Sequence, residues 1–325
     1  MRFDHHVTRE LVDLPALRAF LAAHAVPGLD DVEALADGST RHRRLVPEGD
    51  GHCLLTVSLP AGDVGAPAVT AEGEPDAVAA ATAVGRRWLG LDVDPAPGVA
   101  ALATDRVLGP LVLARPHLRV PGSTDAFETA VLVVLGQHVS LAAGQVFAAR
   151  LVAAHGTARG VGCSGGGPGN HLSTRPEELR AFPSPETLAT LDPVGLQRTV
   201  GITTARARTV VAIARAVCDG ILDLRSQGNF AESGSGTALS GRSAPDSARV
   251  RAGLLALPGV GPWTADLVAL RALRDPDVFL PGDLVLRKAL GGVTATAAAA
   301  VAEAWRPHRS LAVLHLWTQA AIDPR

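Results

Sequence analysis

The sequence predicts an α+β fold in two parts, a mixed α/β sheet domain at residues 1–94 followed by an all-helical domain at 95–325. Alternating helix-like and strand-like stretches predict the first part. Residues 14–24 repeat apolar side chains at helical spacing, and residues 52–59 form a strand pattern between turn residues. Residues 75–89 then return to an Ala-rich helical periodicity.

Helical periodicity from about residue 99 onward predicts the second part, and the Pro-rich run at 94–98 marks the boundary. The clearest helical stretches are 126–155 and 205–218. Gly/Ser-rich inserts at 156–170 and 226–243 interrupt this part and lack large apolar residues at any period. We expect both inserts to be surface loops.

Composition indicates a folded protein with a sizeable core. The chain has 325 residues, of which 47% are hydrophobic and 19% charged, so it is neither disordered nor polybasic. Its net charge of −2 is uneven, because residues 1–128 carry 11 basic and 18 acidic side chains while residues 200–325 carry 14 and 10. The C-terminal half would attract a polyanion, although ordinary scatter of surface charge explains these numbers equally well.

Three widely separated cysteines, Cys53, Cys163 and Cys218, provide neither a disulfide framework nor a zinc or iron–sulfur site. The N-terminus shows no basic region followed by an apolar run, so no secretory signal is expected. The apolar run at 130–136 is too short to span a bilayer. We therefore expect a cytoplasmic, nucleoid-associated protein without membrane contact.

The most informative segment is residues 246–266, where a helix ending at Leu257 leads through Pro-Gly-Val-Gly into a second helix that opens with Pro262. Gly259 and Gly261 are expected to adopt unusual dihedral angles and to let a ligand approach the backbone. Unpaired N–H groups at the start of the second helix then form an anion site suited to phosphate. A plain helical hairpin with a glycine turn explains this segment equally well.

A second signal follows the hairpin, since Asp283 comes directly after Pro281 and Gly282. Hairpin and aspartate together resemble the helix-hairpin-helix DNA glycosylases, and most closely the DNA-3-methyladenine glycosylase II (alkylation-repair) family. Stretches at 20–26, 135–140 and 305–317 extend the resemblance over nearly the whole chain apart from the inserts. It implies a catalytic domain with two helical lobes.

The resemblance implies that Asp283 is the catalytic residue. Asp after Pro-Gly is also a good helix N-cap, and the two roles are compatible. Breaking the N-glycosidic bond creates an oxocarbenium-like sugar, which a carboxylate stabilises while it orients the attacking water. Asp266, Asp275 and Asp277 are expected to be solvated instead.

The residue after the hairpin turn decides between two reaction types. Glycosylases that also cleave the DNA backbone carry a lysine nucleophile there, whereas this chain has Trp263. The only lysine in the sequence, Lys288, lies on a different element. The resemblance therefore implies a monofunctional enzyme without lyase activity.

An aromatic pocket for the damaged base is also implied, and electron-rich indoles would attract a cationic alkylated purine. Trp263 and Leu267 are i,i+4 neighbours on one helix face. We expect Trp88 and Trp305 to be core residues. By resemblance, the pocket residues are Trp263, Trp317, Phe20, Leu267, Leu284 and Gln137.

DNA binding is expected from the hairpin and from one inserted side chain. His138 occupies the position that fills the gap left by a flipped base, although a partly buried structural histidine is the alternative. The implied phosphate contacts come from amides near Gly259, Gly261 and Thr264, supported by Arg271, Arg287 and Arg309. Main-chain carbonyls of Leu255, Leu257 and Val260 are implied ligands of a structural monovalent cation.

The predicted partner is double-stranded DNA with alkylated bases, bound by a monomer that requires no cofactor. Two alternatives stay open: a helix-hairpin-helix glycosylase for another damaged base, and a non-catalytic DNA-binding protein that uses the hairpin as a phosphate clamp.

Overall fold

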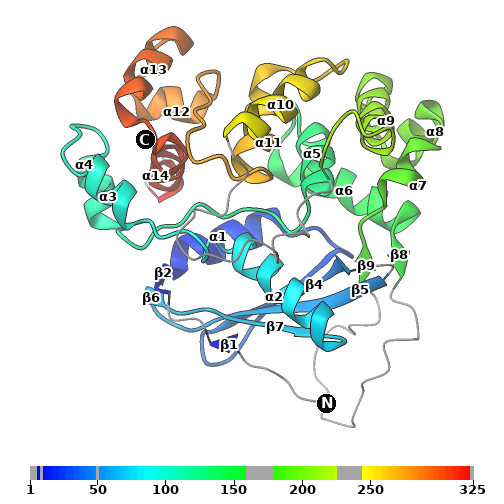
Figure 1. Ribbon diagram of the computed structural model, residues 1–325, viewed down its shortest axis with the longest axis horizontal. Helices are drawn as coiled ribbons and strands as arrows, with labels where there is room; N and C mark the ends of the chain where they lie inside the picture. The colour runs from blue at the N-terminus through cyan, green and yellow to red at the C-terminus, as the bar shows by residue number, and fades with distance from the viewer. Residues whose placement is uncertain (1–5, 8–9, 49–50, 159–178, 225–243, 323–325) are drawn as a thin grey trace.

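The computed structural model describes residues 6–7, 10–48, 51–158, 179–224 and 244–322. A sheet layer carries the N-terminal part of the chain, and a layer of helices covers it (Figure 1). The α+β class predicted from the sequence is confirmed. Within the described ranges, no helix is both long and apolar enough to cross a membrane.

The main sheet has five antiparallel strands in the order β1-β7-β5-β4-β3. The central strand β5 corresponds to the stretch predicted at 52–59, and its Val57 pairs with His42 on one side and Val69 on the other. A two-stranded sheet joins β2 to β6. The strands are β1 (His6–Val7), β2 (Val12–Asp13), β3 (Asp30–Ala34), β4 (Thr40–Glu48), β5 (Gly51–Leu59), β6 (Val64–Gly65) and β7 (Ala68–Glu72).

Two helices belong to the sheet layer, α1 (Leu14–His24) and α2 (Pro75–Trp88), and both match the predicted stretches. Helix α1 is capped by Asp13, whose side chain accepts from the Ala16 N–H. Helix α2 packs closely on β5 and β7, since a Cβ at Gly85 would lie 2.5 Å from Val69. Helix α1 lies on the side of the sheet that faces the helical layer (Figure 1).

In the described residues from Ala96 onward the chain is helical, apart from connecting loops and a short pairing of β8 (Thr157–Ala158) with β9 (Arg180–Ala181). The described helices are α3 (Ala96–Leu102), α4 (Gly109–Ala114), α5 (Ala126–Leu135), α6 (Leu141–His155), α7 (Pro185–Ala189), α8 (Pro193–Val200), α9 (Thr204–Cys218), α10 (Ala244–Leu255), α11 (Pro262–Arg271), α12 (Leu284–Ala289), α13 (Ala295–Ala302), the 3₁₀ turn η3 (Glu303–Trp305) and α14 (Arg309–Ile322).

The stretch predicted as helical over 126–155 is wrong at its centre, where residues 136–140 separate α5 from α6. His138 has a left-handed φ of 55°, and Ser140 caps α6 by accepting from the Ala143 N–H. Helical periodicity in the sequence continues across this break because both helices bury apolar faces in one core. The insert at 226–243 lies outside the described residues, as does the insert at 156–170 beyond β8.

A buried ion cluster joins the two layers. Arg44 of β4 donates to both carboxylate oxygens of Glu128 on α5 at 2.7 Å, and it lies 3.4 Å from Asp30. His42 Nε2 donates to the Asp30 carboxylate at 2.9 Å. These contacts connect the sheet to α5, whose C-terminal end leads into Gln137.

Candidate active site

The hairpin formed by α10, the turn at 256–261 and α11 requires glycine at one of its two glycine positions. Gly259 has φ +83°, and a Cβ there would lie 2.2 Å from the Thr209 hydroxyl oxygen. The expectation of unusual dihedrals is wrong for Gly261, which is extended at φ −97°. A Cβ at Gly261 would meet nothing within 4 Å, which leaves room for a ligand at the backbone. Helix α10 ends at Leu255, two residues before the predicted end.

Helix α11 begins with Pro262, and its first backbone hydrogen bond runs from the Ala265 N–H to the Gly261 carbonyl. The N–H groups of Trp263 and Thr264 therefore lie at a helix N-terminus without an intrahelical acceptor. This end of the helix dipole attracts an anion. The phosphate site expected at these amides stays a prediction, for which this helix N-terminus is suited.

Gln137 contacts the hairpin. Its amide nitrogen donates to the Gly259 carbonyl at 3.1 Å and to the buried Thr264 hydroxyl at 2.8 Å. The main-chain carbonyl of Gln137 accepts a hydrogen bond from the Arg206 guanidinium. The structure therefore shows that Gln137 joins the loop after α5 to the hairpin, a contact that no local sequence pattern predicts. Its place in the pocket stays a prediction.

Asp283 caps α12 and also meets two tryptophans. Its Oδ1 accepts from the backbone N–H groups of Val285 and Leu286 at 2.9 and 3.0 Å. The Trp317 indole donates to Oδ1 and the Trp263 indole to Oδ2, both at 3.3 Å. The carboxylate thus lies beside the start of α11 and is half-buried, within reach of a substrate.

The other predicted pocket residues are more dispersed. Leu284 is 66% exposed and Trp263 36%, while Leu267 and Trp317 are half-buried. Phe20 of α1 packs against the far end of α11, with its ring 4.0 Å from the Arg271 guanidinium. The structure therefore brings Asp283, Trp263 and Trp317 together through hydrogen bonds, whereas the place of Phe20 in the pocket stays a prediction.

His138 is exposed, which excludes the alternative of a partly buried structural histidine. It directly follows Gln137, whose hydrogen bonds hold this part of the loop against the hairpin. Its neighbours Val139 and Leu141 are 36% and 52% exposed. The loop between α5 and α6 thus presents apolar surface beside His138.

Two arginines predicted to contact phosphate are already engaged. Arg271 is only 8% exposed and donates to the Pro121 carbonyl at 3.0 Å. Burial lowers the pKa of Arg271 to about 9. Arg309 binds Asp277 through Nε at 2.8 Å. Arg287 donates to the Val293 carbonyl from Nε and stays half-buried.

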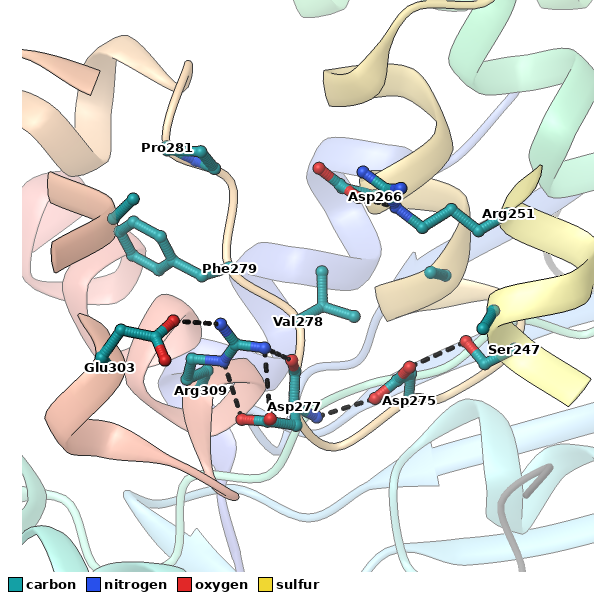
Figure 2. A pocket seen from close by; sticks show the side chains of 13 residues that line it. Ser247, Arg251, Asp266, Asp275, Asp277, Val278, Phe279, Pro281, Glu303 and Arg309 are labelled. Carbon is teal, nitrogen blue, oxygen red and sulfur yellow. Dashed lines mark hydrogen bonds and ion pairs between the residues drawn. The ribbon is translucent and has the colours of Figure 1, made fainter. Parts of the chain in front are cut away.

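The expectation that three aspartates are solvated is also wrong, because each of them bonds a neighbouring arginine or serine in the lining of a cavity of about 350 Å³ beside α10, α11 and α14. Figure 2 shows Arg309 bound to Asp277 and Glu303, and Asp275 bound to Ser247. Asp266, 9% exposed, binds Arg251 at 2.5 Å.

Asp283, Trp263 and Trp317 do not line this cavity, which is therefore separate from the candidate active site. Trp88 and Trp305 are core residues as predicted, at 6% and 1% exposed.

A set of carbonyls at the hairpin could hold a cation. Leu255 is the last residue of α10, where the final carbonyls lack intrahelical partners. The Leu257 carbonyl accepts from the Val260 N–H at 3.2 Å. Within the described ranges, no group of three His, Cys, Asp or Glu side chains could bind a metal ion.

Comparison with known proteins first defines the class. The fold is similar to that of the solved 3-methyladenine DNA-glycosylase from Archaeoglobus fulgidus, with a TM-score of 0.72, 20% identity and 98% of each chain covered. A family model described as the AlkA N-terminal domain matches residues 7–125. The fold is that of a helix-hairpin-helix glycosylase.

Sequence relatives define the family. A probable bifunctional transcriptional activator/DNA repair enzyme AlkA from Mycobacterium tuberculosis is 39% identical over 303 residues, covering 92% of this chain and 53% of that protein. The chain thus spans about half the length of that relative. DNA-3-methyladenine glycosylase 2 from Escherichia coli is 34% identical over 217 residues, covering 67% of this chain and 66% of that protein. The chain belongs to the AlkA-like family of helix-hairpin-helix DNA glycosylases.

Proposed function

We propose that this protein is a monofunctional DNA glycosylase that hydrolyses the N-glycosidic bond of alkylated purines, of the 3-methyladenine and 7-methylguanine type, in double-stranded DNA. One observation carries the proposal: the Asp283 carboxylate lies between the indoles of Trp263 and Trp317, directly beside the glycine hairpin. The names of the Escherichia coli and Archaeoglobus fulgidus relatives support the same class of substrate.

The proposed reaction begins with the damaged base flipped out of the duplex, where it stacks on the indoles. The N-glycosidic bond breaks with its electron pair leaving on the base. Asp283 stabilises the positive charge that develops on the sugar, and a water molecule adds to the sugar carbon and loses a proton. The products are the free base and an abasic site.

DNA contact is assigned to the hairpin and to the loop between α5 and α6. The amides at the start of α11 bind a phosphate, and the open space at Gly261 allows close approach. His138 enters the gap left by the flipped base, because it is exposed and projects from a left-handed backbone. The protein acts on DNA as a monomer without a required cofactor. A monovalent cation on the Leu255, Leu257 and Val260 carbonyls would strengthen the phosphate site.

Replacement of Asp283 by asparagine tests the proposal, because asparagine keeps the helix cap and removes the charge. We expect single-turnover release of 7-methylguanine to fall at least about 100-fold, while binding of the same DNA persists. Asp192→Asn is the matched control, since Asp192 caps α8 in the same way through the Gly195 N–H at 2.8 Å. Unchanged turnover in Asp283→Asn would refute the mechanism.

The alternative of a non-catalytic DNA-binding protein predicts a gel shift without base loss.

Borohydride reduction tests the monofunctional assignment. No covalent enzyme–DNA adduct is expected because Trp263 replaces the nucleophilic lysine and Lys288 lies exposed on α12. A trapped adduct would show lyase chemistry.

A further inference from the structure

The two indoles at the candidate active site contact the carboxylate through their edges. The Trp263 and Trp317 Nε1 atoms each donate to a different oxygen of Asp283 at 3.3 Å. The two tryptophans come from α11 and α14, and Asp283 precedes α12. Three elements far apart in sequence therefore meet at one carboxylate.

An indole N–H bond lies in the plane of its ring. A tryptophan that donates to Asp283 therefore turns its edge toward the carboxylate, and its two faces point elsewhere. The edge can hold the carboxylate while a face stacks on a base, so one side chain is able to perform both tasks. Indole nitrogen donates and never accepts, which makes a carboxylate oxygen its natural partner.

The helix cap alone leaves the carboxylate incompletely restrained. Both backbone N–H bonds from α12 reach Oδ1, and neither reaches Oδ2. The Trp263 indole supplies the contact to Oδ2, and the Trp317 indole adds a third donor to Oδ1. With these four N–H donors both oxygens are held, so rotation about the bond to the carboxylate is restricted.

We propose that Trp263 and Trp317 are positioning residues that orient the Asp283 carboxylate through their indole N–H groups, in addition to any stacking on the base. This inference deepens the proposed glycosylase function and rests on it. It means that the tryptophans contribute to the rate of bond breakage even for lesions that carry no charge.

The contact can be tested without activity. The sequence has four tryptophans, so a ¹⁵N-labelled protein gives four indole N–H resonances. Asp283→Asn should shift two of them, because one indole loses its acceptor to an amide NH2 group and the other then donates to a neutral oxygen instead of a charged one. Asp105→Asn is the matched control and should shift only the Trp305 resonance, since Trp305 donates to Asp105 at 2.9 Å. Unmoved resonances in Asp283→Asn would overturn the inference.

The kinetic consequence is tested with Trp317→Phe and Trp263→Phe, which keep an aromatic face and remove the N–H. The rate of base release should fall about tenfold in each, with little change in KM. The loss should be equal for cationic 7-methylguanine and for neutral hypoxanthine. Trp305→Phe, which loses the same kind of bond in the core, should lower stability and leave the rate per folded molecule unchanged.

A purely stacking role predicts a different result. The loss of activity would be larger for the cationic base and would appear as a higher KM, and this outcome would overturn the positioning role. If the wild-type protein releases no base although Asp283→Asn shifts two resonances, the proposed function fails while the contact stands. The two failures are thereby distinguished.

Discussion

Replacing Gly259 by alanine is expected to destabilise the protein by about 3 kcal/mol. The left-handed backbone costs a residue with a Cβ about 1–2 kcal/mol. The new Cβ would also lie 2.2 Å from the Thr209 hydroxyl oxygen. The single O–H of Thr209 is shared between the carbonyls of Ala205 and Pro258, at 3.1 and 2.9 Å, so it cannot move away without losing this hydrogen bonding. Overpacking of this kind costs about 1–3 kcal/mol.

Urea unfolding measures the change, provided that the slope with denaturant stays the same in each variant. The effect of Gly259→Ala should also be measured in a protein that already carries Thr209→Ala. In that background the overpacking cost should disappear, and only the cost of the left-handed backbone should remain. Gly261→Ala is the matched control, since its φ is ordinary and its Cβ meets nothing. It should leave stability within about 0.5 kcal/mol and weaken DNA binding, measured by fluorescence anisotropy. Equal destabilisation by the two alanines would refute the reasoning.

Three further predictions concern buried charged and titratable groups. Burial lowers the pKa of His315 to about 4, so the neutral ring contributes its full stabilisation above about pH 6.5. This stabilisation, about 3 kcal/mol, is lost as the pH falls from 6.5 to 4. His315→Leu should therefore flatten the dependence of the free energy of unfolding on pH in this range, measured by urea unfolding. Glu128→Leu should lower the free energy of unfolding by about 3 kcal/mol, because it leaves Arg44 buried without its closest carboxylate. Adding Arg44→Met should recover part of this loss. A double variant whose loss equals the sum of the losses in the two single variants would contradict the pairing. Arg271 has no carboxylate within 4 Å among the described residues, so Arg271→Met should keep the packing on Phe20 and lose only the hydrogen bond to the Pro121 carbonyl, about 1 kcal/mol. Arg271→Ala should lower the melting temperature further, because the packing is lost as well; an equal loss in the two variants would contradict the packing role.

Local signals were sufficient for much of the fold. The predicted stretches at 14–24, 52–59 and 75–89 correspond to α1, β5 and α2 because their periodicity reflects one buried face. The break at 136–140 was missed, because two helices that bury their apolar faces in one core look continuous in sequence.

Burial of charged residues was the main error at the site. Arg271 and Asp266 lie on α11 among apolar residues. Charged side chains are usually exposed to solvent, so the sequence did not predict that these two are buried. Their actual burial depends on α1, on Pro121 and on Arg251, which come from distant parts of the chain. A local pattern carries no information about such partners.

The sequence alone determined the chemical parts of the candidate site: a glycine turn at 258–261, an aspartate placed to cap a helix at 283 and a tryptophan at 263. Each of these is a property of a few consecutive residues. Only the tertiary structure decided that the indole edges of Trp263 and Trp317 meet the two oxygens of Asp283. Helical periodicity establishes which face of a helix is buried, whereas the packing of α11, α12 and α14 establishes which side chains those faces bring together.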